Sequence, residues 1–132
     1  DFTTYQARAT DFVAVQEVGR VIHPAIAGGQ IEGGVAQAIG WALYEDVVLR
    51  QGVMQNFQLT NYILPTSADT PPIRVFFYEN PYQYGPFGAK GLGELPMDGP
   101  APAVAAGVVQ ALGGKIISRI PILPETILES LA

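Results

Sequence analysis

The sequence predicts an α+β fold in which short mixed strands accompany two main helices. One long segment and one alanine-rich segment have helical patterns, and Ile73–Tyr78 has the β-branched and aromatic composition of a strand. The chain contains no internal repeat and no low-complexity linker. We therefore expect residues 1–132 to form a single α+β segment.

The first helix is predicted to run from about Gln30 to about Leu49. Its apolar side chains recur at the intervals that place them on one face of a helix. These side chains are Ile31, Val35, Ala38, Ile39, Ala42, Leu43 and Val47. Gly28-Gly29 precedes the predicted start, and Gln51-Gly52 closes the predicted end. A helix start led by glycine favours an anion, because its free N–H groups and the helix dipole attract negative charge.

Three glycines, Gly33, Gly34 and Gly40, lie inside this predicted helix. Each costs about 0.5–1 kcal/mol relative to alanine. We interpret them as positions where another backbone or a cofactor comes close. At Gly40, ordinary packing against another helix is an equal alternative.

A second helix is predicted from Gly99 or Pro100 to Leu112, with Gly113-Gly114 as its cap. His23 precedes a proline beside a turn and is predicted to be structural or simply exposed. The other expected elements are extended structure at Thr10–Val18 and Met54–Leu59, irregular chain at Asn61–Pro65, a surface loop at Thr66–Pro72, a short strand at Lys115–Ser118 and helical turns at Pro124–Leu131.

Charged residues are scarce in this chain of 132 residues. They make up 14% of it, against a usual share of about 25%, while 48% of the residues are hydrophobic. The net charge of −5 gives no basic surface for nucleic acid. The longest weakly polar run, Pro100–Leu112, is shorter than the ~20 residues that a membrane span needs. We therefore expect much of the surface to be covered inside a larger assembly.

No cysteine is present, which excludes disulfides, iron–sulfur ligation and thiol nucleophiles within this chain. His23 is the only histidine, so neither a zinc site nor a Ser-His-Asp triad has a clear set of residues. The first residue is Asp1, and we expect a processed product, a fragment or one piece of a split protein.

The most unusual stretch is the loop Tyr84–Glu94, with four glycines, one proline and a single carboxylate. Such backbone turns tightly and can come close to a ligand. We hypothesise that the loop is half of an active site and that Glu94 is its acid–base residue; the alternative is a structural turn with a solvated Glu94.

The loop does not match the known nucleotide-binding motifs. Its glycine order is G-x-x-G-x-G, the reverse of the dinucleotide fingerprint, and no Ser or Thr follows Lys90 as a P-loop requires.

Two motifs give the chain a specific resemblance. The run Gly88–Glu94 (GAKGLGE) resembles the G-x-K-G-x-G-E loop of the molybdenum hydroxylases, the family of xanthine dehydrogenase and aldehyde oxidase. Upstream, Gly29–Gly34 (GQIEGG) is similar to that family's G-Q-x-E-G-G segment, in the same order and at about the same spacing. The resemblance covers nearly the whole chain. It implies the C-terminal part of a molybdopterin-binding domain.

The resemblance also implies roles for individual residues. The family's loop glutamate, matched by Glu94, takes a proton from a metal-bound hydroxide while its oxygen attacks an electron-poor carbon. The residues that the resemblance places at the cofactor are Gln30, Gly29, Gly91, Leu92 and Gly93. The pterin holds the molybdenum, so no protein side chain is expected as a metal ligand. The implied cofactor is a molybdopterin, in a cytosine dinucleotide form if the chain is bacterial.

Departures from the family imply partners. Family subunits are several times longer, and the remainder carries the rest of the cofactor site and most of the substrate pocket. Other chains are expected to supply that remainder, the [2Fe–2S] clusters and FAD, in the cytoplasm or the periplasm. The implied substrate is an aldehyde or a purine-like N-heterocycle. Two alternatives stay open: a non-catalytic module that docks onto a larger oxidoreductase subunit, and a hydrolase that pairs Glu94 with Asp98.

Overall fold

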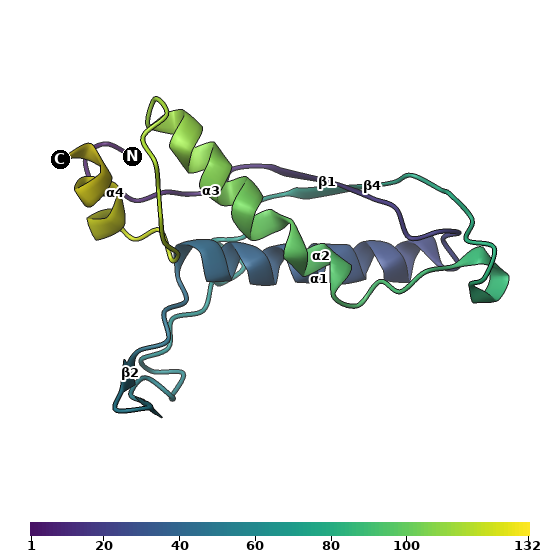
Figure 1. Cartoon of the computed structure of the whole chain (residues 1–132), viewed down its shortest axis with the longest axis horizontal. Helices are drawn as coiled ribbons and strands as arrows, with labels where there is room; N and C mark the ends of the chain where they lie inside the picture. The colour runs from purple at the N-terminus through teal and green to yellow at the C-terminus, as the bar shows by residue number, and fades with distance from the viewer.

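The long helix α1 (Pro24–Leu43) is the element on which the rest of the chain packs. A computed structural model describes all 132 residues. Helix α3 (Pro100–Ala111) crosses α1, and the strands β1 (Phe12–Gln16) and β4 (Ile73–Phe77) run beside it (Figure 1). The chain is thus α+β, as predicted.

The strands form two separate pairs. Strands β1 and β4 are parallel, with Phe12 opposite Ile73. Strands β2 (Leu49–Arg50) and β3 (Val53–Met54) form a short antiparallel hairpin. The predicted strand at Ile73–Tyr78 is confirmed as β4, and the extended segment Thr10–Val18 contains β1. The mixed strands of the expected fold class are therefore present.

A single apolar cluster joins these elements. The buried stripe of α1 consists of Ile31, Val35, Ala38, Ile39, Ala42 and Leu43, which are six of the seven side chains predicted for it. It packs against Ala14 of β1, Ala101 of α3 and Ile122 and Ile127 near the C-terminus. Burial of each large aliphatic side chain contributes about 1.5–3 kcal/mol, so this stripe fixes the position of α1.

The predicted bounds of the first helix were wrong at both ends. The helix begins at Pro24, because proline suits the first helical position and His23 caps it. The His23 Nδ1 atom accepts the N–H of Ile26 at 3.3 Å, which makes His23 structural. Gly28-Gly29 therefore lies inside the helix, and the proposed anion site at a glycine-led start does not exist.

At its other end α1 stops at Leu43. The Gly40 carbonyl accepts the N–H groups of both Tyr44 and Glu45 at 2.9 Å, which closes the last turn. A β-carbon on Gly40 would lie 2.4 Å from Glu45 Oε1 and 2.8 Å from Pro65. The close approach predicted at Gly40 is thus made by the chain beyond the helix.

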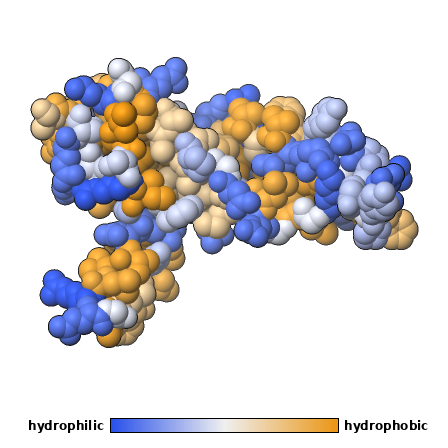
Figure 2. Space-filling view, in the orientation of Figure 1, coloured by the Kyte–Doolittle hydropathy of each residue, from blue (hydrophilic) through white to orange (hydrophobic).

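Residues 45–64, called the arm here, project from the body at the end of α1 (Figure 1). The Gln51-Gly52 pair has φ values of +50° and +77° and forms the hairpin turn, so it does not close a helix as predicted. Large apolar side chains of the arm are 39–80% exposed, and Figure 2 shows its hydrophobic surface. They are Val47, Val48, Leu49, Val53, Phe57, Leu59, Ile63 and Leu64.

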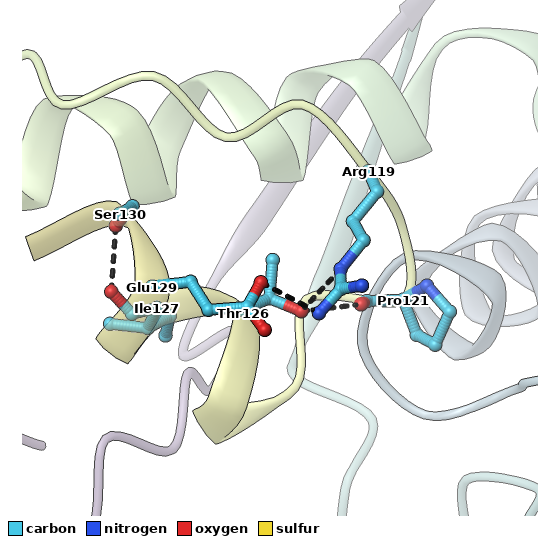
Figure 3. Close-up of polar contacts among 6 residues, drawn as sticks. All are labelled: Arg119, Pro121, Thr126, Ile127, Glu129 and Ser130. Atoms are coloured by element: carbon cyan, nitrogen blue, oxygen red, sulfur yellow. Dashed lines mark hydrogen bonds and ion pairs between the residues drawn. The ribbon is translucent and has the colours of Figure 1, made fainter. Parts of the chain in front are cut away.

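The C-terminal part closes one end of the body. Helix α3 and its cap at Gly113-Gly114 are confirmed, as is the terminal helix α4 (Pro124–Leu131). Arg119 donates to Thr126 Oγ1 at 3.3 Å and pairs with Glu129 at 2.9 Å (Figure 3). The short strand expected at Lys115–Ser118 is absent, because no neighbouring strand pairs with that segment.

Only 18 of the 132 residues are buried, so the apolar composition leaves many large hydrophobic side chains on the surface. No helix combines the length and the apolar composition that a membrane span requires.

Candidate active site

The glycine loop runs back along α1, from the turn η1 (Pro86–Gly88) at one end of the molecule to α2 (Leu95–Asp98) (Figure 1). Its first half is joined to the chain that follows β1. The Arg20 N–H donates to the Gly88 carbonyl at 2.8 Å, and the Lys90 N–H donates to the Val18 carbonyl at 2.9 Å. These bonds form an antiparallel bridge between Gly19 and Ala89.

Gly19 is required by this bridge. Its φ is +71°, and a β-carbon there would lie 2.3 Å from the Gly88 carbonyl oxygen. Any other residue would therefore combine a left-handed backbone with a steric clash. The sequence marked Gly19 only as part of a turn, whereas the structure makes it the contact point of the glycine loop.

Side chains reinforce the same region. Lys90 Nζ forms an ion pair with Glu17 Oε2 and lies 5.7 Å from the centroid of the Tyr82 ring. The other carboxylate oxygen, Glu17 Oε1, accepts the Gly19 N–H at 2.7 Å. The hydrogen bond from Lys90, followed by that from the Gly19 backbone, lowers the pKa of Glu17. Glu17 was missed from the sequence because 73 residues separate it from Lys90.

Helix α1 holds the second half of the loop on both sides of Glu94. Gln30 Nε2 donates to the Gly93 carbonyl at 3.3 Å, one residue before Glu94. One helical turn further along α1, Gly34 allows the buried Pro96 to pack against the helix. A β-carbon on Gly34 would lie 2.6 Å from Pro96 Cβ. The close approach predicted at Gly34 is thus made by α2, which directly follows Glu94.

Glu94 itself is exposed at the N-terminal end of α2. Its side chain caps nothing in the helix, and no side chain or backbone group of this chain donates to it. Only its backbone carbonyl is engaged, as the acceptor of the Met97 N–H at 2.9 Å. The backbone of Glu94 is therefore fixed while its carboxylate is free to accept a proton or a hydrogen bond.

A groove of about 410 Å³ adjoins this region. It lies between the segment after β1, the first turns of α1 and the residues just before Glu94, and its walls include Gln30, Leu92 and Gly93. Three of the five residues predicted to bind a cofactor are therefore brought together. Gly29 and Gly91 are exposed and are not part of the groove wall.

The glycines of the site have open space beside them. A β-carbon added to Gly29, Gly91 or Gly93 would meet no atom within 4 Å apart from those of the adjoining residues and, at Gly29, the backbone of its own helix. By contrast, the space beside Gly19 is occupied by Gly88 and the space beside Gly34 by Pro96. The three open glycines would let an external group approach the backbone closely, next to the amide of Gln30. This arrangement fits a large polar cofactor with hydrogen-bonding edges.

The chain offers no side-chain cage for a metal ion: nowhere do three His, Cys, Asp or Glu residues gather at one site.

Comparison with known proteins gives the family. The family model for the molybdopterin cofactor-binding domain matches residues 1–71. The chain belongs to this family. It is 33% identical over 117 residues to the xanthine dehydrogenase molybdenum-binding subunit of Escherichia coli O157:H7, covering 87% of the chain and 15% of that protein. It is 33% identical to the aldehyde oxidoreductase of Megalodesulfovibrio gigas, covering 99% of the chain and 14% of that protein.

Solved structures of the family share the fold. Quinoline 2-oxidoreductase from Pseudomonas putida 86 matches with a TM-score of 0.92 and 42% identity, over 98% of this chain and 17% of that one. This molybdopterin cofactor-binding segment therefore spans about 15% of the length of the curated relatives it matches. The α+β arrangement described above is one part of their molybdenum-binding subunits.

Proposed function

We propose that this molybdopterin cofactor-binding segment carries the catalytic base of a molybdenum hydroxylase. The observation that supports this most directly is the position of Glu94. Contacts of α1 with Gly93 and Pro96 hold its backbone on both sides, and its carboxylate is unpaired. The preceding residue, Gly93, lines a groove that also contains Gln30. A base needs this combination of a fixed position and a free lone pair.

The residues that hold the cofactor in this proposal are Gln30, Gly29, Gly91, Leu92 and Gly93. The Gln30 amide has a second N–H and a carbonyl oxygen beyond the bond to Gly93, and these can pair with a heterocycle edge. The open glycines let the cofactor approach the backbone. When bound, the molybdenum cofactor supplies the oxidising centre and the oxygen atom to be transferred. We infer a cytosine dinucleotide form from the resemblance to bacterial enzymes.

Glu94 accepts a proton at a carboxylate oxygen in this reaction. Proton transfer to a positioned side chain typically contributes 10²- to 10⁴-fold to a rate. We propose an aldehyde or an electron-poor N-heterocycle as the substrate. The relatives support this range, since their names include an aldehyde oxidoreductase, a quinoline 2-oxidoreductase and a xanthine dehydrogenase.

The partner in this proposal is the remainder of a molybdenum-binding subunit, together with chains that carry [2Fe–2S] clusters and FAD, in the cytoplasm. The relatives are about six times longer than this chain, and their added length is available to cover its surface. The apolar arm is one surface for that contact. The outer face of the β1–β4 sheet is another, because parallel sheets are normally buried on both faces and Val15 and Phe76 are 64% and 53% exposed here.

Glu94→Gln in the complete complex tests the assignment of the base. Asp98→Asn is the matched control, since Asp98 is an exposed acid at the other end of α2. We expect turnover to fall by about 10²-fold or more in Glu94→Gln and to stay near normal in Asp98→Asn, with the molybdenum content unchanged in both. Near-normal turnover of Glu94→Gln would overturn the proposal. A complex that contains this chain but no molybdenum or pterin would overturn it as well.

A further inference from the structure

The first half of the glycine loop has more backbone hydrogen bonds to other elements than the second half has. Up to Lys90 the loop is bonded to the chain after β1 through Gly88 and Lys90. Beyond Lys90, the backbone as far as Glu94 has one bond to another element, from Gln30 to Gly93. Two of the four residues after Lys90 are glycines with open space around them. The direction in which the chain leaves Lys90 therefore has a large effect on where Glu94 lies.

Glu17 and Lys90 meet at the point where the loop becomes open. Glu17 uses one carboxylate oxygen for the Gly19 N–H, 2.7 Å away, and the other for the Lys90 ammonium group. Lys90 in turn lies over the Tyr82 ring. A single carboxylate thus joins the turn after β1 to the side chain at the point where the loop becomes open.

The pair contributes little to overall stability. The side chains of Lys90 and Glu17 are 36% and 31% exposed, and ion pairs in contact with solvent typically contribute little to the free energy of unfolding. The position of a catalytic group, however, can depend on an ion pair that contributes little to the stability of the fold. A displacement of about 1 Å at a catalytic group can lower a rate by about 10²-fold.

We propose that Glu17 and Lys90 are positioning residues, whose ion pair sets the path of Gly91–Gly93 and thereby the place of the Glu94 carboxylate. This inference rests on the proposed function of Glu94. It assigns no contact with substrate or cofactor to either residue. It accounts for the only basic residue in the loop.

The test is the pair of variants Lys90→Met and Lys90→Arg in the complete complex, with Lys115→Met as the control at the chain's other lysine, which is exposed. Lys90→Met keeps the backbone bond to Val18 but loses the ion pair. We expect its kcat to fall about tenfold while KM and molybdenum content stay unchanged. Lys90→Arg, which keeps the charge, should retain most of the activity, and Lys115→Met should retain all of it.

Two further measurements separate positioning from other roles. Glu17→Gln should reproduce the loss of kcat, and both Glu17→Gln and Lys90→Met should speed amide hydrogen exchange at positions 20 and 90, whose N–H groups bond to Gly88 and Val18. Normal kcat in Lys90→Met, or an equal loss in Lys90→Arg, would overturn the inference, as would a parallel loss of molybdenum. If Glu94→Gln is inactive while Lys90→Met is normal, only the positioning role fails. If Glu94→Gln is active, the proposed function itself fails.

Discussion

The side-chain amide of Gln30 donates a hydrogen bond to the backbone carbonyl of Gly93, 3.3 Å away and 63 residues later in the chain. This bond joins the two motifs that carry the family resemblance. It also joins the long helix to the residue just before the candidate base. One N–H of the Gln30 amide therefore binds the loop, while its other N–H and its carbonyl oxygen remain available for a group in the groove.

Gln30→Ala should weaken cofactor retention. It removes both the bond to Gly93 and the remaining donor and acceptor, whereas an exposed hydrogen bond contributes only about 0.5–1.5 kcal/mol to folding. We expect molybdenum and pterin content to fall several-fold with little change in the unfolding temperature. Gln37→Ala, at an exposed glutamine on the same helix, is the control. Full cofactor content in Gln30→Ala would contradict the role of Gln30.

Gly34→Ala and Gly33→Ala should have opposite effects on stability. The new methyl group at position 34 would lie 2.6 Å from Pro96 Cβ, and such overpacking typically costs about 1–3 kcal/mol. At position 33 the methyl group meets nothing, and replacing a helical glycine gains up to about 1 kcal/mol. Thermal unfolding of the two variants measures the difference. A change of the same sign in both would contradict this account of Pro96.

The base of the arm should respond to high pH. Tyr62 donates to Glu45 Oε2 at 2.8 Å, and this hydrogen bond is the main reason that the pKa of Tyr62 is raised above its usual value near 10. A raised folded-state pKa stabilises the fold below pH ~10, and the contribution is lost as the pH rises through the folded pKa.

Tyrosinate absorbance measures this effect. Subtracting the titration of Tyr62→Phe isolates the one phenol, and Glu45→Gln should bring its pKa back toward 10. An unchanged Tyr62 titration in Glu45→Gln would show that the hydrogen bond is not the cause.

The arm should be required for assembly with the rest of the enzyme. Leu59 is 80% exposed, and Leu59→Lys places a charge in the apolar surface of the arm. Thr60→Lys adds the same charge at the adjacent, polar position. We expect Leu59→Lys to reduce co-purification with the remaining subunits markedly and Thr60→Lys to leave it nearly unchanged. Equal yields of complex from the two variants would show that the arm is not covered there.

The sequence predicted the elements better than their limits. The apolar stripe of α1 was recognisable because it follows the helical period, but His23 was placed beside a turn, whereas it caps the helix. Val47 continued the period and extended the predicted helix into the arm. Local patterns cannot show that Pro65, which is distant in sequence, packs where the helix ends.

The site was predicted only in part, because local patterns do not show contacts between residues that are distant in sequence. Motif resemblance singled out Glu94, Gln30 and the glycines, and the structure brings Gln30, Leu92 and Gly93 to one groove. Glu17 and Pro96 act through contacts with residues far away in the sequence, so no local spacing indicated them. The resemblance also assigned no role to Lys90. These supporting contacts became visible only with the tertiary structure.

The two attachments of the loop to α1 lie on successive turns, at Gln30 and Gly34. One contact alone would leave a pivot, whereas two contacts about 6 Å apart along the helix also fix the angle of the chain between them. The spacing of Gln30 and Gly34 on the helix thus sets the positions of the two chain segments on either side of Glu94. Inserting one residue between positions 30 and 34 would rotate one attachment by about 100° relative to the other. Such an insertion should misalign Glu94 more than any single substitution, although α1 itself would remain helical.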